Sequence, residues 1–180
     1  MTSLSKGPPS HVLRLTNRYP LFIVAKDKSP PHMPIWAMGR VSVHIYGRPK
    51  GHGTRNLIDD YASRNSSAGM ELVVHSDKTG LSDYEQKIES RGAELILLDE
   101  SGSLLTSMEL AELISEVTVS DRNTIFAVGP ADGFSDDLKL RTKKISISKM
   151  TLTHEMATAI LLEQLYRASE INKGSQYHRS

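Results

Sequence analysis

The sequence predicts an α/β domain in which a mainly parallel sheet is flanked by helices. Short apolar runs alternate five times with longer amphipathic segments, and this alternation is typical of strand–helix–strand units. Two of the apolar runs, residues 93–100 and 123–129, are continuous, which indicates strands buried on both faces of a sheet. Because parallel strands need a crossover connection, the segments between the runs are predicted to be helices that cover the sheet.

The strands are expected where short apolar or alternating runs lie between glycines and polar turns. VSVHIYG alternates and ends on glycine, and ISISKM alternates as well, so both segments are predicted to be strands. The expected strands are residues 41–47, 70–76, 93–100, 123–129 and 145–150.

The helices are expected from capping residues that precede amphipathic segments. Thr54 is a candidate N-cap, and Thr106 with Glu109 three residues later forms a candidate capping box. Ser82 and Glu85 form a second candidate capping box for the next helix along the sheet. The expected helices are residues 54–64, 82–91, 106–117, 138–144 and 154–170.

Length and composition limit the possible classes of protein. The 180 residues, 38% of them apolar, predict one domain with its own core. The absence of cysteine excludes disulfide scaffolds, thiolate metal sites and cysteine nucleophiles. The histidines show no metal-ligand spacing and no apolar run approaches a membrane span, so neither a metal nor a membrane is expected as a partner. A net charge of +1 means that nucleic-acid binding would need a local basic patch.

Residues 1–37 differ from the rest of the chain. They hold six of the eight prolines, five basic residues and a single acid, and they show no helix or strand period. This segment is interpreted as a disordered extension, a targeting peptide or a mis-assigned start upstream of Met38, with the misplaced start favoured. Residues 38–180 are then one domain, which is expected in the cytoplasm, or in an organelle if the first segment is a transit peptide.

A ligand site is expected beyond the carboxyl ends of the strands, where open α/β sheets bind their ligands. Three such ends carry candidate residues, and the middle one reads GPADG, in which Gly129 and Gly133 allow a close approach of the backbone. The loop is neither a GxGxxG motif nor a P-loop, so a ligand held by the backbone fits it better than a pyrophosphate. The alternative is an ordinary strand-to-helix turn.

The last helix and the residues after it form a second candidate site. Glu163, Tyr166 and Arg167 share one helix face, so Arg167 is either half of an ordinary ion pair or a functional cation. The sequence closes on Tyr177, His178 and Arg179, which form either a solvated tail or a segment that folds back over a site.

Read in order, these motifs resemble the RlmH family of SPOUT-class methyltransferases. The motifs are LLDESG, GPADGFS, SKMTLTH, EQLYRA and QYHRS, and the resemblance covers about residues 38–180. It implies methylation at N3 of a pseudouridine in large-subunit ribosomal RNA, within the assembled subunit or ribosome. It also implies a C-terminal trefoil knot, a homodimer and S-adenosyl-L-methionine bound in the knot. The cofactor positions carried over by motif are Leu98, Gly129, Ser148, Lys149, Met150, Thr151, Leu152 and Thr153.

The resemblance also suggests how the last residues take part in catalysis. N3 of pseudouridine must lose a proton, and His178 is the group with a suitable pKa to accept it. Arg179 and Arg167 could hold a phosphate or the charge that develops on the base, and Tyr177 could stack on the extruded base. The tail is expected to complete the active site across the dimer interface.

Two departures from the family pattern leave other functions open. The chain reads Val128-Gly129 where the family usually has two glycines, and its loop before Gly133 is one residue longer. A non-catalytic ribosome-associated protein of the same fold is therefore one alternative. A SPOUT methyltransferase that acts on another RNA, such as a tRNA, is a second one.

Overall fold

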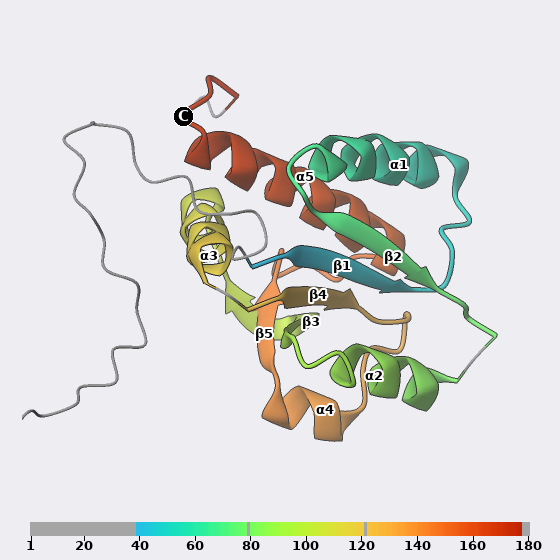
Figure 1. The fold of residues 1–180 in the computed structure, drawn as a ribbon. Helices are drawn as coiled ribbons and strands as arrows, with labels where there is room; N and C mark the ends of the chain where they lie inside the picture. The colour runs from blue at the N-terminus through green and yellow to red at the C-terminus, as the bar shows by residue number, and fades with distance from the viewer. Residues whose placement is uncertain (1–38, 79, 121, 178–180) are drawn as a thin grey trace, which may run out of the picture. The chain divides into compact units, whose positions relative to one another are not determined.

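In the computed structural model, which describes residues 39–78, 80–120 and 122–177, five strands form one sheet with helices on both faces (Figure 1). All four strand pairings are parallel, and the strand order is β2-β1-β4-β3-β5. The α/β prediction is therefore confirmed. The elements are β1 Val41–Tyr46, α1 His52–Ser66, β2 Glu71–His75, α2 Leu81–Glu89, β3 Glu94–Leu104, α3 Ser107–Val119, β4 Thr124–Val128, α4 Asp136–Arg141, β5 Lys143–Ser146 and α5 His154–Asn172.

The central strand β4 explains why its sequence is apolar without alternation. All five of its residues are buried, because helices cover both faces of the sheet at this point. One core lies on the face covered by α1, α3 and α5, where Phe126 and Val128 pack with residues of those helices. Ile125 and Ala127 point to the other face and pack against α2 and α4. Figure 1 shows the same division of the helices between the two faces.

Two predicted boundaries shift near the end of the sheet. β5 ends at Ser146 rather than at residue 150, because the segment that follows leaves the sheet and Ser146 Oγ donates to the carbonyl of Ser148 at 2.9 Å. α4 begins at Asp136 rather than at residue 138, since Ser135 caps it by accepting a hydrogen bond from the amide of Leu138. The C-terminal knot implied by the resemblance is compatible with this strand order.

The capping predictions are partly wrong. The capping box of Thr106 and Glu109 is present and starts α3 as expected. The expected box of Ser82 and Glu85 is absent, because α2 begins one residue earlier, after Gly80, and the Glu85 carboxylate binds a residue of another element.

Thr54 is likewise not the N-cap of α1, because that helix starts at His52. Its hydroxyl lies within the first turn, where it is hydrogen-bonded to the Gly51 carbonyl and to the Glu155 carboxylate. Both errors have one cause. Sequence spacing shows which local hydrogen bond a capping side chain can form, whereas in the folded protein that side chain can bind a residue distant in the sequence instead.

β3 and β5 pair with an interruption that places two backbones in close contact. Ile145 pairs with Leu98 and again with Ser103, so the residues between these two positions leave the ladder and return. A Cβ built on Gly102 would lie 2.5–2.7 Å from backbone atoms of Ile145. Only a residue without a side chain fits there while the two segments stay in place.

The interpretations of residues 1–37 and of Met38 lie outside the described residues. Extension, targeting peptide and misplaced start all remain predictions, as does the single domain over 38–180. Within the described part of the chain, no helix is long and apolar enough to span a membrane.

His44 and His75 contact each other across two neighbouring strands of the sheet. His44 is fully buried on β1, and its Nδ1 lies 2.9 Å from Nε2 of His75 on the neighbouring strand. Burial, together with the positive charges of the nearby His75 and Arg91, lowers the pKa of His44 to about 4. Burial also lowers the pKa of His75. The folded protein therefore binds fewer protons at this pair than the unfolded chain does.

The free energy of unfolding is expected to fall as the pH drops from about 6.5 to about 4. The unfolded chain takes up a proton at His44 near its ordinary pKa of 6.5, whereas the folded protein takes it up only near 4. Urea unfolding across this window should show the decline. In His44→Asn the slope of the unfolding free energy against pH should be smaller, by the contribution of about one bound proton. Equal slopes for the two proteins would contradict this assignment.

Candidate cofactor pocket and carboxyl-terminal cluster

A cavity of about 400 Å³ lies beyond the carboxyl ends of β3, β4 and β5. Residues of these strands and of the loops that follow them line it, together with Lys139 of α4 and with His154 and Ala157 at the start of α5. This is the edge of the sheet where the sequence predicted a ligand site, and the volume suits a small organic ligand. The strand and loop residues in the lining are Leu98, Asp99, Glu100, Val128, Gly129, Pro130, Ala131, Asp132, Gly133, Ser146, Ile147, Ser148, Met150, Thr151 and Leu152.

Most of the predicted cofactor positions line this cavity. These six positions are Leu98, Gly129, Ser148, Met150, Thr151 and Leu152. Lys149 and Thr153 are not among the lining residues. Thr153 instead caps α5, because its hydroxyl accepts a hydrogen bond from the amide of Met156 at 3.3 Å. The cap supplies a reason for threonine at this position that does not involve a ligand.

The two glycines of the GPADG loop meet different requirements. Gly133 has φ +78°, in the left-handed region that favours glycine. A Cβ on Gly129 would lie 3.2 Å from the ring of Phe134, which folds back under the loop. The GPADG loop therefore lines the cavity mainly with backbone and small side chains.

A charged pair from two elements lies in the cavity wall. Lys139 of α4 places its ammonium 3.3 Å from the carboxylate of Asp99 at the bulge of β3. Burial acts to raise the pKa of Asp99, but hydrogen bonds from Ser101 and from Lys139 outweigh it and hold the pKa below its ordinary value. The carboxylate is therefore ionised at neutral pH. Sequence reasoning missed Lys139, because no local pattern shows that α4 projects it toward β3.

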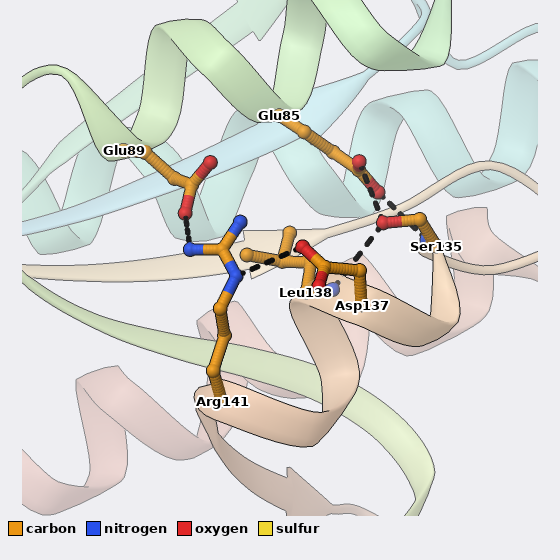
Figure 2. A network of polar contacts seen from close by, with 6 residues as sticks. All are labelled: Glu85, Glu89, Ser135, Asp137, Leu138 and Arg141. Carbon is orange, nitrogen blue, oxygen red and sulfur yellow. Dashed lines mark hydrogen bonds and ion pairs between the residues drawn. The ribbon is translucent and has the colours of Figure 1, made fainter.

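A hydrogen-bonded network fixes the loop from the opposite side (Figure 2). The Glu85 carboxylate of α2 accepts hydrogen bonds from the amide of Ser135 at 2.7 Å and from its hydroxyl at 2.8 Å. Ser135 directly follows Phe134 and starts α4, so Glu85 ties α2 to the end of the cavity loop. In the same network Arg141 binds Glu89 and Asp137, but that arginine is half exposed.

Removing the Glu85 carboxylate is expected to weaken ligand binding without changing the cavity lining. A hydrogen bond to a charged group contributes about 1.5–3 kcal/mol, and part of this contribution holds the loop in place, so Glu85→Ala should weaken cofactor binding about tenfold. Calorimetry with S-adenosyl-L-methionine measures the change. Arg141→Ala is the matched control from the same network, and it should leave affinity unchanged because exposed ion pairs contribute little. An equal effect of both variants would contradict the positioning role of Glu85.

Tyr177, the last described residue, folds back onto α5. Its ring meets that of Tyr166 edge-on with centroids 5.0 Å apart, and the guanidinium of Arg167 lies 5.0 Å from its centroid. Its hydroxyl lies 3.4 Å from Glu163, which also forms an ion pair with Arg167 at 2.6 Å. Tyr177 is thus packed and half-buried, whereas His178 and Arg179 lie outside the described residues.

α1 extends this cluster. The ring of Tyr61 lies 6.3 Å from that of Tyr166, and the guanidinium of Arg64 lies over both rings at 5.3 and 5.7 Å. Burial and a hydrogen bond with Tyr61 raise the pKa of Tyr177 to about 12. The tyrosine is therefore neutral at physiological pH and can act as a hydrogen-bond donor but not as a base.

The cluster and the cavity are at opposite ends of α5. Ala157 lines the cavity and Tyr166 packs on Tyr177, and a separation of nine residues corresponds to about 14 Å along a helix axis. The described residues of one chain therefore do not bring the two candidate sites together. They also contain no group of three or more histidine or acidic residues that could hold a metal ion.

Comparison with known proteins agrees with the sequence motifs. The family model described as "Predicted SPOUT methyltransferase" matches residues 40–178. The chain is 35% identical to the "Ribosomal RNA large subunit methyltransferase H" of Geobacter sp. (strain M21), in an alignment that covers 77% of this chain and 98% of that protein. The protein of the same name from Geobacter metallireducens is 42% identical, over 74% of this chain and 95% of its own.

A more distant relative of the same name, from Oenococcus oeni, is 32% identical over 79% of this chain and 100% of its own. A solved structure of a probable methylase family protein from Haemophilus influenzae Rd KW20 aligns with a TM-score of 0.48 at 14% identity, over 74% of this chain and 66% of that one, and a likeness this low supports no conclusion. With the family model spanning nearly all of the described residues, the chain belongs to the SPOUT methyltransferase family.

Proposed function

We propose that this protein transfers a methyl group from S-adenosyl-L-methionine to N3 of a pseudouridine in large-subunit ribosomal RNA. The observation that carries the proposal is that six positions assigned to the cofactor by motif line one cavity at the expected edge of the sheet. The relatives' name, which specifies large-subunit ribosomal RNA, supports the class of substrate. The substrate is the RNA within the assembled subunit or ribosome.

The residues of the cavity suit this cofactor. Leu98, Ile147 and Leu152 supply apolar surface, and Gly129 lines the cavity without a side chain. Ionised Asp99 and Lys139 could bind the ammonium and carboxylate groups of an amino-acid moiety, once their own ion pair opens. When bound, the cofactor supplies a methyl group on a sulfonium, which is electrophilic.

His178 accepts the proton that leaves N3 of the base, and the N3 lone pair then forms the bond to the methyl carbon as the carbon–sulfur bond breaks. Arg167 and Arg179 stabilise negative charge on the base or its phosphate. Tyr177, neutral at physiological pH, stacks on the extruded base. Arg167 is already held by Glu163, so its guanidinium is fixed before substrate arrives.

The active site is completed in a homodimer. A single chain leaves about 14 Å of α5 between its cavity and Tyr177, which is too far for direct contact with a substrate in that cavity. The tail of one protomer therefore serves the cavity of its partner. The enzyme works where ribosomes are, in the cytoplasm, or in an organelle if residues 1–37 form a transit peptide.

The test is the modification state of ribosomal RNA in cells that lack this gene. Mass spectrometry of the large-subunit RNA should show loss of one methyl group from a pseudouridine, and the purified protein should restore it on isolated ribosomes. An unchanged ribosomal RNA together with a lost mark in tRNA would favour a different RNA substrate. No heat of S-adenosyl-L-methionine binding would indicate a non-catalytic protein of the same fold.

A further inference from the structure

A cationic segment follows β1 and runs into the first turn of α1, at the same edge of the sheet as the cavity. Residues 47–55, hereafter the basic loop, read GRPKGHGTR and contain three full cations, one histidine and no acid. The side chains of Arg48, Lys50, His52 and Arg55 are all exposed. Because β1 is parallel to β3, β4 and β5, its carboxyl end points to the cavity edge (Figure 1).

Glu155 fixes the basic loop to the rim of the cavity. Its carboxylate accepts hydrogen bonds from the amides of Lys50 at 2.6 Å and Gly51 at 3.2 Å, and from the hydroxyl of Thr54. Hydrogen bonds from Thr54 and Lys50 lower the pKa of Glu155, so the carboxylate remains ionised. Glu155 directly follows His154, which lines the cavity, and therefore the loop backbone is tied to the site.

Two cations of the loop remain directed to solvent. The guanidinium of Arg55 donates to the Pro49 carbonyl at 2.7 and 3.1 Å, so that side chain holds the loop together. Arg48 and Lys50 form no side-chain ion pair with an acid of the described residues. Even with Glu155 beneath it, the segment carries more positive than negative charge.

The other side of the cavity has the opposite charge. Asp99, Glu100 and Asp132 line it, and Lys139, the lysine among the lining residues, is bound to Asp99. A polyanion that approaches the cavity is repelled on this side and attracted on the side of the basic loop. The charge distribution around the rim therefore sets the side from which an RNA strand can reach the site.

We infer that the basic loop binds backbone phosphates of the substrate RNA next to the target nucleotide, through Arg48 and Lys50, with Glu155 as the residue that positions the loop. The identity of this RNA rests on the proposed function, whereas the phosphate contact rests on the loop's charge and geometry. Such contacts set register and affinity rather than sequence preference.

The first test is the charge reversal R48E/K50E in the full chain. The probe is large ribosomal subunits from cells that lack this gene, with binding measured by sedimentation over a salt series. Binding should weaken at least about tenfold at 0.1 M salt, and the salt slope should fall by about one for each phosphate that the loop no longer neutralises. KM for subunits should rise while kcat changes little, and the affinity for S-adenosyl-L-methionine should stay the same.

R40E/R122E is the matched control. It makes the same change in net charge at two exposed residues, and these precede β1 and β4 at the opposite edge of the sheet. Equal loss of binding in both double variants would show a nonspecific charge effect and overturn the inference. So would a wild-type protein that does not bind the subunits. If wild type binds but does not methylate, the proposed function fails, and the comparison of the two variants still decides the loop's role.

Glu155→Ala separates positioning from simple charge. Removing this acid makes the rim more positive, so charge alone predicts tighter binding to the subunits, whereas loss of the loop's hydrogen bonds predicts weaker binding. We expect weaker binding, with partial recovery in Glu155→Gln, which keeps one amide oxygen as an acceptor. Tighter binding of Glu155→Ala would overturn the positioning role.

Discussion

Deleting residues 177–180 is expected to reduce methylation of ribosomes by at least about 100-fold, because a positioned general base contributes about 10²–10⁴ to a rate. The affinity for S-adenosyl-L-methionine should change less than about threefold, since Tyr177, the one described residue of this segment, does not line the cavity in its own chain. His178→Ala alone should produce most of the loss. Single-turnover methylation and calorimetry measure the two quantities. A truncated protein that methylates at the normal rate would refute the role of the tail.

The dimer can be tested with two inactive proteins. One is the chain without residues 177–180, and the other is Ala131→Trp, which fills the cavity from an exposed lining position. If the tail of one protomer serves its partner's cavity, mixed dimers contain one complete site and activity returns on mixing. A site made within one chain predicts that the mixture stays inactive.

Gly102→Ala is expected to cause a large loss of stability. The added Cβ would meet backbone atoms of Ile145 at 2.5–2.7 Å, and backbone cannot move aside as a flexible side chain can. A cost of about 3 kcal/mol would lower Tm by about 6–12 °C for a domain of this size. Cofactor affinity should fall as well, because β5 leads directly into cavity residues Ser146 and Ile147.

Gly53→Ala provides the control for Gly102. The residue is inside the first turn of α1, and a Cβ added there would meet no neighbouring segment of the described chain within 4 Å. Alanine should therefore be neutral or should raise stability by up to about 1 kcal/mol. Calorimetric melting of the two variants gives the comparison. Similar Tm values for both would contradict the packing argument at Gly102.

Local pattern predicted the parts of this protein that depend on local interactions. The continuous apolar run ending at Val128 gave the central strand, because a strand covered on both faces has no polar side to alternate with. Thr106 and Glu109 gave the start of α3, since both partners of a capping box lie within one turn. The edge of the sheet that holds the cavity followed from strand direction alone.

The errors fall where a side chain has a choice of partner. Ser82 and Glu85 have the spacing of a capping box, yet the Glu85 carboxylate binds Ser135, which lies 50 residues away. Thr54 is a residue type that often caps helices, yet its hydroxyl donates a hydrogen bond to Glu155 of α5, a helix on the same side of the sheet. Sequence spacing indicates which local hydrogen bonds a side chain can form. It carries no information on alternative partners that come near only when the chain folds.

The sequence by itself determined the α/β class, the edge of the sheet with the ligand site, and, through its motifs, the methyltransferase family. Periodicity and short motifs suffice for these, because each depends on residues close together in the chain. Only the tertiary structure decided that Lys139 meets Asp99, that Glu155 holds the basic loop, and that α5 separates the cavity from Tyr177. These are contacts between distant segments, and their geometry is set by how the helices pack on the sheet.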